Sequence, residues 1–163
     1  MTQTYLYNLS SDGREAIRQT LRLMSDIVKS SRKDIALRET ALDLTRYLKQ
    51  KSFVDEVQAL FNFVQKKIRY IRDIHTVETI HLPDKILEYG QGDCDDKSIL
   101  LATLLETIGH PTRFVAAGFG GQPLSHVWVE TKVGGKWLAL DATDDHSMGW
   151  KPSGISSAMI IYN

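Results

Sequence analysis

The first half of the chain repeats apolar residues every three or four positions, which is the spacing of one buried face of an amphipathic helix. This pattern predicts three helices, over about residues 12–29, 34–49 and 54–70. Asp12 is of a residue type that caps helix N-termini, so it marks the start of the first helix. The pattern stops between residues 71 and 83, which predicts a loop, and Pro83 suits the start of a short helical turn after it.

The second half of the chain has the features of strands. Residues 112–119 are rich in β-branched and aromatic side chains, which favour strands. The runs 125–133 and 136–142 flank a Gly-Gly pair, which is typical of a two-residue hairpin turn. Residues 159–162 suit a last strand. Helices followed by antiparallel strands predict an α+β fold.

The hairpin turn also predicts which side chains share a face of the sheet. A two-residue turn pairs Val133 with Lys136, so the numbers of paired residues sum to 269. Side chains alternate along each strand, which puts His126, Trp128 and Asp141 on one face. His126 and Asp141 are then diagonal neighbours, roughly 7–8 Å apart at the backbone and within reach of each other's side chains.

The only cysteine lies at the start of a predicted helix. Asp93 is a good N-cap, and apolar residues recur at helical spacing after Cys94 until Gly109 and Pro111 stop the pattern. Unpaired backbone N–H groups and the positive end of the helix dipole favour a thiolate at such a position. These features predict that the pKa of Cys94 lies well below that of a free thiol.

A lone cysteine is more often a small buried apolar residue than a nucleophile. Here a histidine and an aspartate follow it on two predicted strands. Cys94, His126 and Asp141 therefore match the thiol version of a nucleophile, base and orienting acid. No HExxH, paired-cysteine or calcium-loop spacing is present, so we expect neither a metal nor another cofactor.

In their order along the chain, these motifs resemble the transglutaminase-like superfamily, a variant of the papain-like fold. The resemblance covers about residues 53–145. It implies a helical N-terminal half and a catalytic-cysteine helix packed on an antiparallel sheet. It also implies acyl transfer or amide hydrolysis on a protein or peptide substrate. The matching motifs are 60–70, 92–96, 108–115, 126–130 and 137–143.

Attack by sulfur on an amide produces an oxyanion, which needs hydrogen-bond donors. The backbone N–H of Cys94 is one natural donor. For the second donor, the sequence leaves Gln91, Gln65 and Tyr70 as alternatives. Trp128 either lines the cleft or packs within the hairpin.

The charge balance limits the classes of partner. The chain has 20 Lys and Arg against 20 Asp and Glu, so its formal net charge is zero. This indicates no bulk attraction to nucleic acid or to an anionic membrane. The N-terminus has no block typical of a signal peptide, and a cytoplasmic location is expected, with a place in a phage particle left open.

The sequence also leads to an expected division of the chain and to an alternative to enzymatic activity. Residues 1–52 are expected to form a helical extension packed on a domain of residues 53–163, in one compact unit. The alternative to an enzyme is a catalytically silent binding or assembly module on the same fold.

Overall fold

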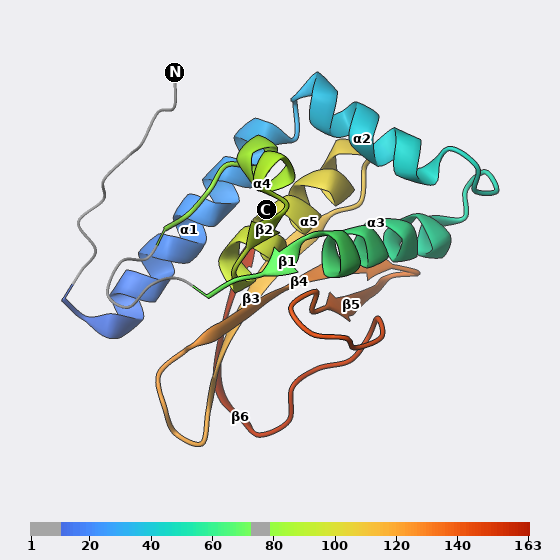
Figure 1. Ribbon diagram of the computed structural model, residues 1–163. Helices are drawn as coiled ribbons and strands as arrows, with labels where there is room; N and C mark the ends of the chain where they lie inside the picture. Colours follow the sequence, from blue (N-terminus) through green and yellow to red (C-terminus); the bar gives the residue numbers. More distant parts are fainter. Residues whose placement is uncertain (1–10, 73–78) are drawn as a thin grey trace.

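A computed structural model describes residues 11–72 and 79–163 of the chain. Three helices come first and form an arc around a central helix, α5, which lies on a four-stranded sheet (Figure 1). The helices are α1 Gly13–Ser31, α2 Ile35–Thr45, α3 Phe53–Lys67, α4 Pro83–Tyr89 and α5 Cys94–Thr107. The strands are β1 Arg69–Tyr70, β2 Gln91–Gly92, β3 Thr112–Phe119, β4 His126–Val133, β5 Lys136–Leu140 and β6 Ile155–Tyr162.

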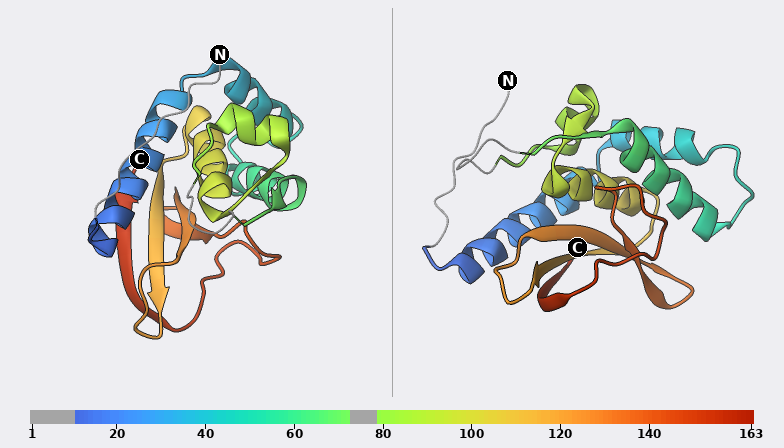
Figure 2. Two further views of the ribbon diagram at one scale, coloured as in Figure 1. Left: turned by 60° about the vertical axis from the view of Figure 1, so that its left-hand side comes forward. Right: turned by 60° about the horizontal axis from the view of Figure 1, so that its bottom comes forward.

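The larger sheet is antiparallel, with strand order β5-β4-β3-β6, and all five helices lie on one of its faces (Figure 2). The hairpin register is the one predicted from the turn, because Val133 pairs with Lys136 and Val129 pairs with Leu140. Gly134 and Gly135 have φ angles of 57° and 81°, the left-handed conformation that a two-residue turn of this kind requires. The predicted register is therefore confirmed.

Helix α5 is the centre of the core. Apart from Cys94 and Glu106, all of its residues are buried, since it contacts α1, α2, α3 and α4 as well as the sheet. Ile99, Leu100 and Leu104 have no exposed surface. A helix enclosed on nearly all sides needs apolar residues around its whole circumference, which explains why this segment lacks a clear polar face.

The first helix belongs to the same core. Leu21, Met24 and Val28 of α1 pack in one apolar cluster with residues from α3, α5 and the sheet. The hydroxyl of Ser25 also donates a hydrogen bond to the carbonyl of Tyr162 on β6, at 3.3 Å. The division into an extension (1–52) and a domain (53–163) stays a prediction, but the two parts share one core.

The structure confirms the predicted helices and strands, with small shifts at their ends. It adds the two-residue parallel pair β1–β2, which the pattern does not predict because two residues are too few to show a period. It also extends the last strand back to Ile155. His110, whose position beside Gly109 and Pro111 is typical of a surface loop, is instead buried at 6% exposure, and its ring lies 2.7 Å from a carboxylate oxygen of Glu56. His75 lies outside the described residues.

The loop between β3 and β4 depends on Gly118. A Cβ atom at this position would lie 2.4 Å from the carbonyl oxygen of Gln122 and 2.9 Å from that of Pro123. We expect Gly118→Ala to lower the free energy of unfolding by about 1–3 kcal/mol, because the loop backbone must move to make room. Urea denaturation measures the change.

Gly13→Ala is the matched control, because nothing lies within 4 Å of a Cβ atom there. In helix α1 that substitution is expected to be neutral or to stabilise by up to about 1 kcal/mol. Equal stabilities of the two variants would contradict the close loop packing.

Candidate active site

The start of helix α5 is fixed by short-range contacts. The Asp93 carboxylate accepts hydrogen bonds from the backbone N–H groups of Asp95 and Asp96, so it is the predicted N-cap. Gly90 ends α4 in the left-handed conformation, at φ 63°. Gly92 has no room for a side chain, because a Cβ atom would lie 2.5 Å from that of Asp96. These residues leave Cys94 at the first position of the helix.

Asp96 connects this turn to the segment before α4. Its side chain is almost fully buried, and it accepts a hydrogen bond from the backbone N–H of His81 at 2.9 Å. Its second oxygen lies 2.9 Å from Nδ1 of the same histidine. The buried carboxylate therefore fixes the segment before α4 against the start of α5.

Cys94 lies between its own helix and strand β4. Its thiol donates a hydrogen bond to the carboxylate of Asp95, with 3.6 Å between Sγ and Oδ1. The backbone N–H of Val127 donates a hydrogen bond to the sulfur. Since Val127 directly follows His126, this contact brings the thiol beside the predicted base.

The prediction of a lowered thiol pKa is wrong for this arrangement. Burial raises the pKa of the Cys94 thiol well above its ordinary value, and the carboxylates of Asp95 and Asp93 raise it further. The hydrogen bond from Val127 lowers it, but by less. The thiol is therefore neutral here, and a base must remove its proton before it can act as a nucleophile.

His126 and Asp141 form the pair predicted from the hairpin register. Nε2 of His126 lies 2.6 Å from Oδ2 of Asp141. The other carboxylate oxygen accepts hydrogen bonds from the backbone N–H and the hydroxyl of Thr143. Burial raises the pKa of Asp141, but the hydrogen bonds from His126 and Thr143 outweigh it and hold the pKa below its usual value. The ionised carboxylate of Asp141 thus pairs with Nε2 of His126. The other ring nitrogen, Nδ1, can then accept a proton from another group.

Gln65 is not an oxyanion donor in this structure. Its side-chain amide donates hydrogen bonds to the carbonyl oxygens of Asp144 and His146, at 2.6 and 2.8 Å. These carbonyls belong to the segment that follows Asp141. The glutamine therefore fixes this segment against helix α3, which corrects the role suggested by its sequence position.

Lys97, one turn after the cysteine, supports the same region. Its ammonium group is buried and donates hydrogen bonds to the carbonyl oxygens of Ile68 and Gln65, at 2.7 and 3.3 Å. Burial lowers the pKa of Lys97 to about 8, while the charges of Asp141 and Asp144 act in the opposite direction. Its neighbours in the sequence, Asp96 and Ser98, are polar, so the local pattern gives no sign that this charge is buried.

Trp128 does not line the cleft. It is 1% exposed and packs with Val115, Ala117 and Ala139 on the sheet face opposite the main core. Its ring centroid lies 6.0 Å from that of His126. The tryptophan thus supports the imidazole ring from within the sheet.

Gln91 and Tyr70 lie on the paired strands β2 and β1, just before the cysteine. The amide oxygen of Gln91 accepts a hydrogen bond from Arg69 at 2.9 Å, which leaves its NH₂ group as a donor. Burial raises the pKa of Tyr70 above its usual value. Tyr70 therefore keeps its proton at neutral pH and is a hydrogen-bond donor.

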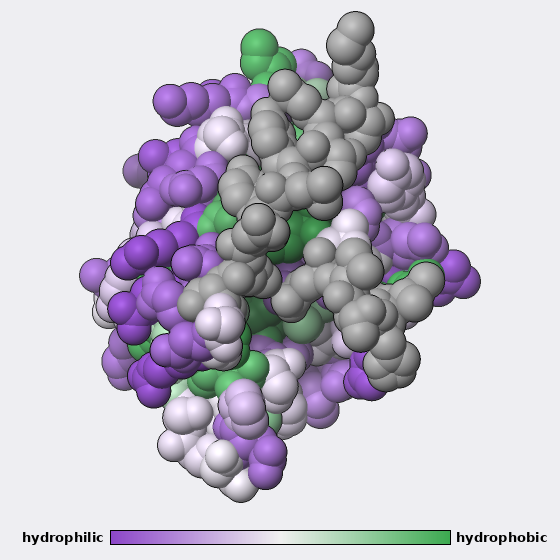
Figure 3. Space-filling model, turned by 90° about the vertical axis from the view of Figure 1, so that its left-hand side faces the viewer, coloured by the Kyte–Doolittle hydropathy of each residue, from purple (hydrophilic) through white to green (hydrophobic). Residues whose placement is uncertain are grey.

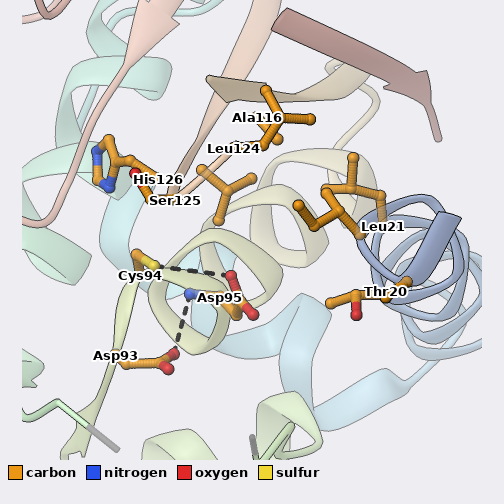
Figure 4. Close-up of a pocket in the computed structure, with 12 residues that line it drawn as sticks. Thr20, Leu21, Asp93, Cys94, Asp95, Ala116, Leu124, Ser125 and His126 are labelled. Carbon is orange, nitrogen blue, oxygen red and sulfur yellow. Dashed lines mark hydrogen bonds between the residues drawn. The ribbon is translucent and has the colours of Figure 1, made fainter. Parts of the chain in front are cut away.

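A cavity of about 130 Å³ opens beside the thiol. Its walls are the start of α5 and the residues around His126, and helix α1 stands across from them (Figure 4). In the same view, the ring of His126 points away from α1. The local pattern identifies the buried face of α1 but not what it faces, so the sequence does not predict this wall.

Within residues 11–72 and 79–163, no group of three or more His, Cys, Asp or Glu side chains is arranged to hold a metal ion. None of the described helices is long and apolar enough to span a membrane.

Comparison with protein families and solved structures places this geometry in context. The sequence model of the family described as Transglutaminase-like superfamily matches residues 38–142. A search of curated proteins found no match.

Three solved structures share the fold. A candidate protease from Parabacteroides distasonis ATCC 8503 is 18% identical with a TM-score of 0.64, over 80% of this chain and 26% of that one. A candidate cysteine protease from Cytophaga hutchinsonii is 18% identical with a TM-score of 0.58, over 78% and 46%. A structure of the Rad4/XPC nucleotide excision repair complex, concerned with DNA duplex opening, is 14% identical with a TM-score of 0.52, over 83% and 40%. This chain spans less than half the length of each, so the likeness shows the fold alone.

The cause of the raised thiol pKa leads to a first prediction about the site. Asp95→Asn removes the nearest negative charge and should lower the pKa of Cys94. The rate of Cys94 alkylation by iodoacetamide at pH 7 should then rise by about tenfold, since one pKa unit changes the thiolate fraction tenfold. The rate is measured from pH 6 to pH 10.

Asp34→Asn, at the N-cap of α2, is the matched control, because that carboxylate caps a different helix. Its pH profile should equal that of the wild type. If Asp95→Asn leaves the profile unchanged, the charge of Asp95 does not hold the thiol neutral.

The contacts of Gln65 lead to a second prediction. Gln65→Met keeps the length of the side chain but removes both hydrogen bonds to the segment 144–146. Amide hydrogen exchange in residues 141–147 should accelerate by about tenfold, because this segment then opens more readily. Gln58→Met is the control, since Gln58 lies on the same helix and its side-chain amide donates a hydrogen bond to Asn62 within that helix. Equal exchange in both variants would remove the positioning role.

Proposed function

Because this chain belongs to the transglutaminase-like superfamily, we propose that it is a cysteine-dependent enzyme that cleaves or transfers the acyl group of an amide in a protein or peptide. Cys94 is the nucleophile, His126 the base and Asp141 the orienting acid. One observation carries the proposal: His126, whose ring lies 2.6 Å from the carboxylate of Asp141, lines the same cavity as Cys94.

The first step is attack on the amide. Sγ of Cys94 forms a bond to the carbonyl carbon, the thiol proton moves to Nδ1 of His126, and the carbonyl π electrons move to oxygen. Asp141 stabilises the imidazolium through Nε2. This order of events suits a thiol that is neutral at rest, because the base removes its proton as the sulfur attacks.

The oxyanion needs two donors. The backbone N–H of Cys94 is the first, since the first turn of a helix has no intrahelical acceptor for its N–H groups. Tyr70 is the second, because its phenol keeps its proton and its backbone pairs with Gly92, two residues before the cysteine. Gln91 remains the alternative, through the NH₂ group that Arg69 does not engage.

The second half of the reaction releases the acyl group. His126 gives its proton to the leaving nitrogen, which departs as ammonia or an amine and leaves a thioester on Cys94. Water or an amine then attacks the thioester, His126 accepts the proton from it, and the thiol leaves. Water gives hydrolysis or deamidation, and an amine gives a new amide.

Turnover of a glutamine-containing peptide library tests this proposal. Cys94→Ala and His126→Ala should each lower turnover by at least about a thousandfold, and Asp141→Asn by about a hundredfold or more, as is usual for such triads. Mass spectrometry with and without added amine distinguishes hydrolysis from transfer by the mass of the product.

Asp145→Asn is the matched control for the acid, because Asp145 is exposed and lies four residues further along the chain. It should retain full turnover. A folded Cys94→Ala variant that keeps turnover would overturn the thiol mechanism. A wild-type chain without turnover on any library member would favour the alternative of a silent binding or assembly module.

A further inference from the structure

Helix α1 forms a wall of the cavity beside Cys94. Four of its residues line that wall: Ala16, Ile17, Thr20 and Leu21. They lie on one face of the helix, because they are separated by one, three, four and five positions. All four precede residue 38, where the match to the family begins.

The wall is held in place by the core. Leu21 is 2% exposed, and Met24 and Val28, which follow on the same face of α1, have no exposed surface. The two smallest members of the wall, Ala16 and Thr20, lie one turn apart and leave the space that the cavity occupies. Figure 4 shows Thr20 and Leu21 on the opposite side of the cavity from Cys94 and His126.

Apart from His126, the described residues on the sheet side of the cavity carry no titratable side chain. This side is lined by Ala116, Leu124, Ser125 and Val127. Leu124 reaches it because the β3–β4 loop turns back, with the N–H of Ser125 bonded to the carbonyl of Ala117 at 2.9 Å. On the side of the molecule where α1 lies, Figure 3 shows apolar surface between polar residues.

The charges of the cavity lie at one end. Among the described residues that line it, Asp93 and Asp95, at the start of α5, are the only acidic ones, and none carries a Lys or Arg side chain. Two carboxylates beside the thiol disfavour a negatively charged substrate group there. The remaining lining is mostly aliphatic, which favours an uncharged, apolar group.

The volume limits the size of that group. An apolar cavity of about 150 Å³ in another protein binds benzene, so a cavity of about 130 Å³ suits a branched aliphatic side chain or a small ring. We infer that the cavity is a substrate subsite for an aliphatic side chain next to the reacting amide, with its specificity set by α1. This inference rests on the proposed function, because it assigns the cavity to the substrate of Cys94.

Alkylation of Cys94 by chloroacetyl amino-acid amides tests the subsite. The thiolate forms an S–C bond and chloride leaves, so the reaction needs no catalytic base. At pH 9, the leucine probe should react at least about tenfold faster than the glycine probe, the usual value of burying one aliphatic side chain. The aspartate probe should be slower than both. Unsubstituted chloroacetamide reports the thiol itself.

Two substitutions in the cavity walls and one control outside them locate the effect. Ala16→Phe should fill the cavity and reduce the leucine-to-glycine ratio to about one, without changing the chloroacetamide rate. Arg22→Phe is the matched control, because it adds the same side chain to an exposed position on α1 and should keep the wild-type ratio. Leu124→Ala enlarges the cavity from the opposite wall and should shift preference from the leucine to the phenylalanine probe.

The inference is overturned if wild type shows a ratio near one, or if a folded Ala16→Phe variant keeps the wild-type ratio. If that variant does not fold, Leu124→Ala decides, and an unchanged preference refutes the subsite. Failure of the proposed function gives a different result: peptide turnover survives in Cys94→Ala, or is absent in wild type, while the probe ratios still report the cavity.

Discussion

The docking of helix α5 on strand β4 is the contact on which the candidate site depends. The hydroxyl of Ser98 donates to the carbonyl of Val127 at 3.4 Å, and the N–H of Val127 donates to the sulfur of Cys94. The carbonyl and the N–H of Val127 thus both attach the helix to the strand next to His126. A slip of α5 by one turn would move the thiol by about 5.4 Å and take it away from the histidine. The surrounding helices prevent that slip, because α5 is buried on nearly all sides.

The features that the sequence predicts well depend on residues close together along the chain. Two glycines fix the hairpin turn, and the turn and the strand pleat together set the faces of His126 and Asp141. The roles of Gln65 and Trp128 depend instead on which segments meet across the fold. Gln65 bonds to carbonyls 79 and 81 residues away, and no local pattern contains that separation. The sequence does not predict the α1 wall of the cavity either, because α1 and α5 are far apart along the chain.

The error in the thiol pKa comes from the relative size of two effects. A helix N-terminus stabilises a negative charge by about 0.3–1 kcal/mol at an exposed position. Burial can shift a pKa by several units, and each unit corresponds to about 1.36 kcal/mol. Position on a helix is visible in the sequence, whereas burial against β4 is not. For Cys94, burial has a larger effect on the pKa than the helix N-terminus has, and the carboxylates of Asp93 and Asp95 raise the pKa further.

The energetics of Asp141 bear on whether this chain acts as a catalyst or only as a binding surface. The fold is shared by candidate proteases and by a DNA repair complex, so the fold does not decide. Asp141 is 4% exposed, and burying a carboxylate costs free energy that its hydrogen bonds must offset. A binding surface therefore has no need of a buried acid joined to a histidine at the edge of a cavity. A base that must accept a proton from a neutral thiol does need one, because the carboxylate stabilises the imidazolium that forms.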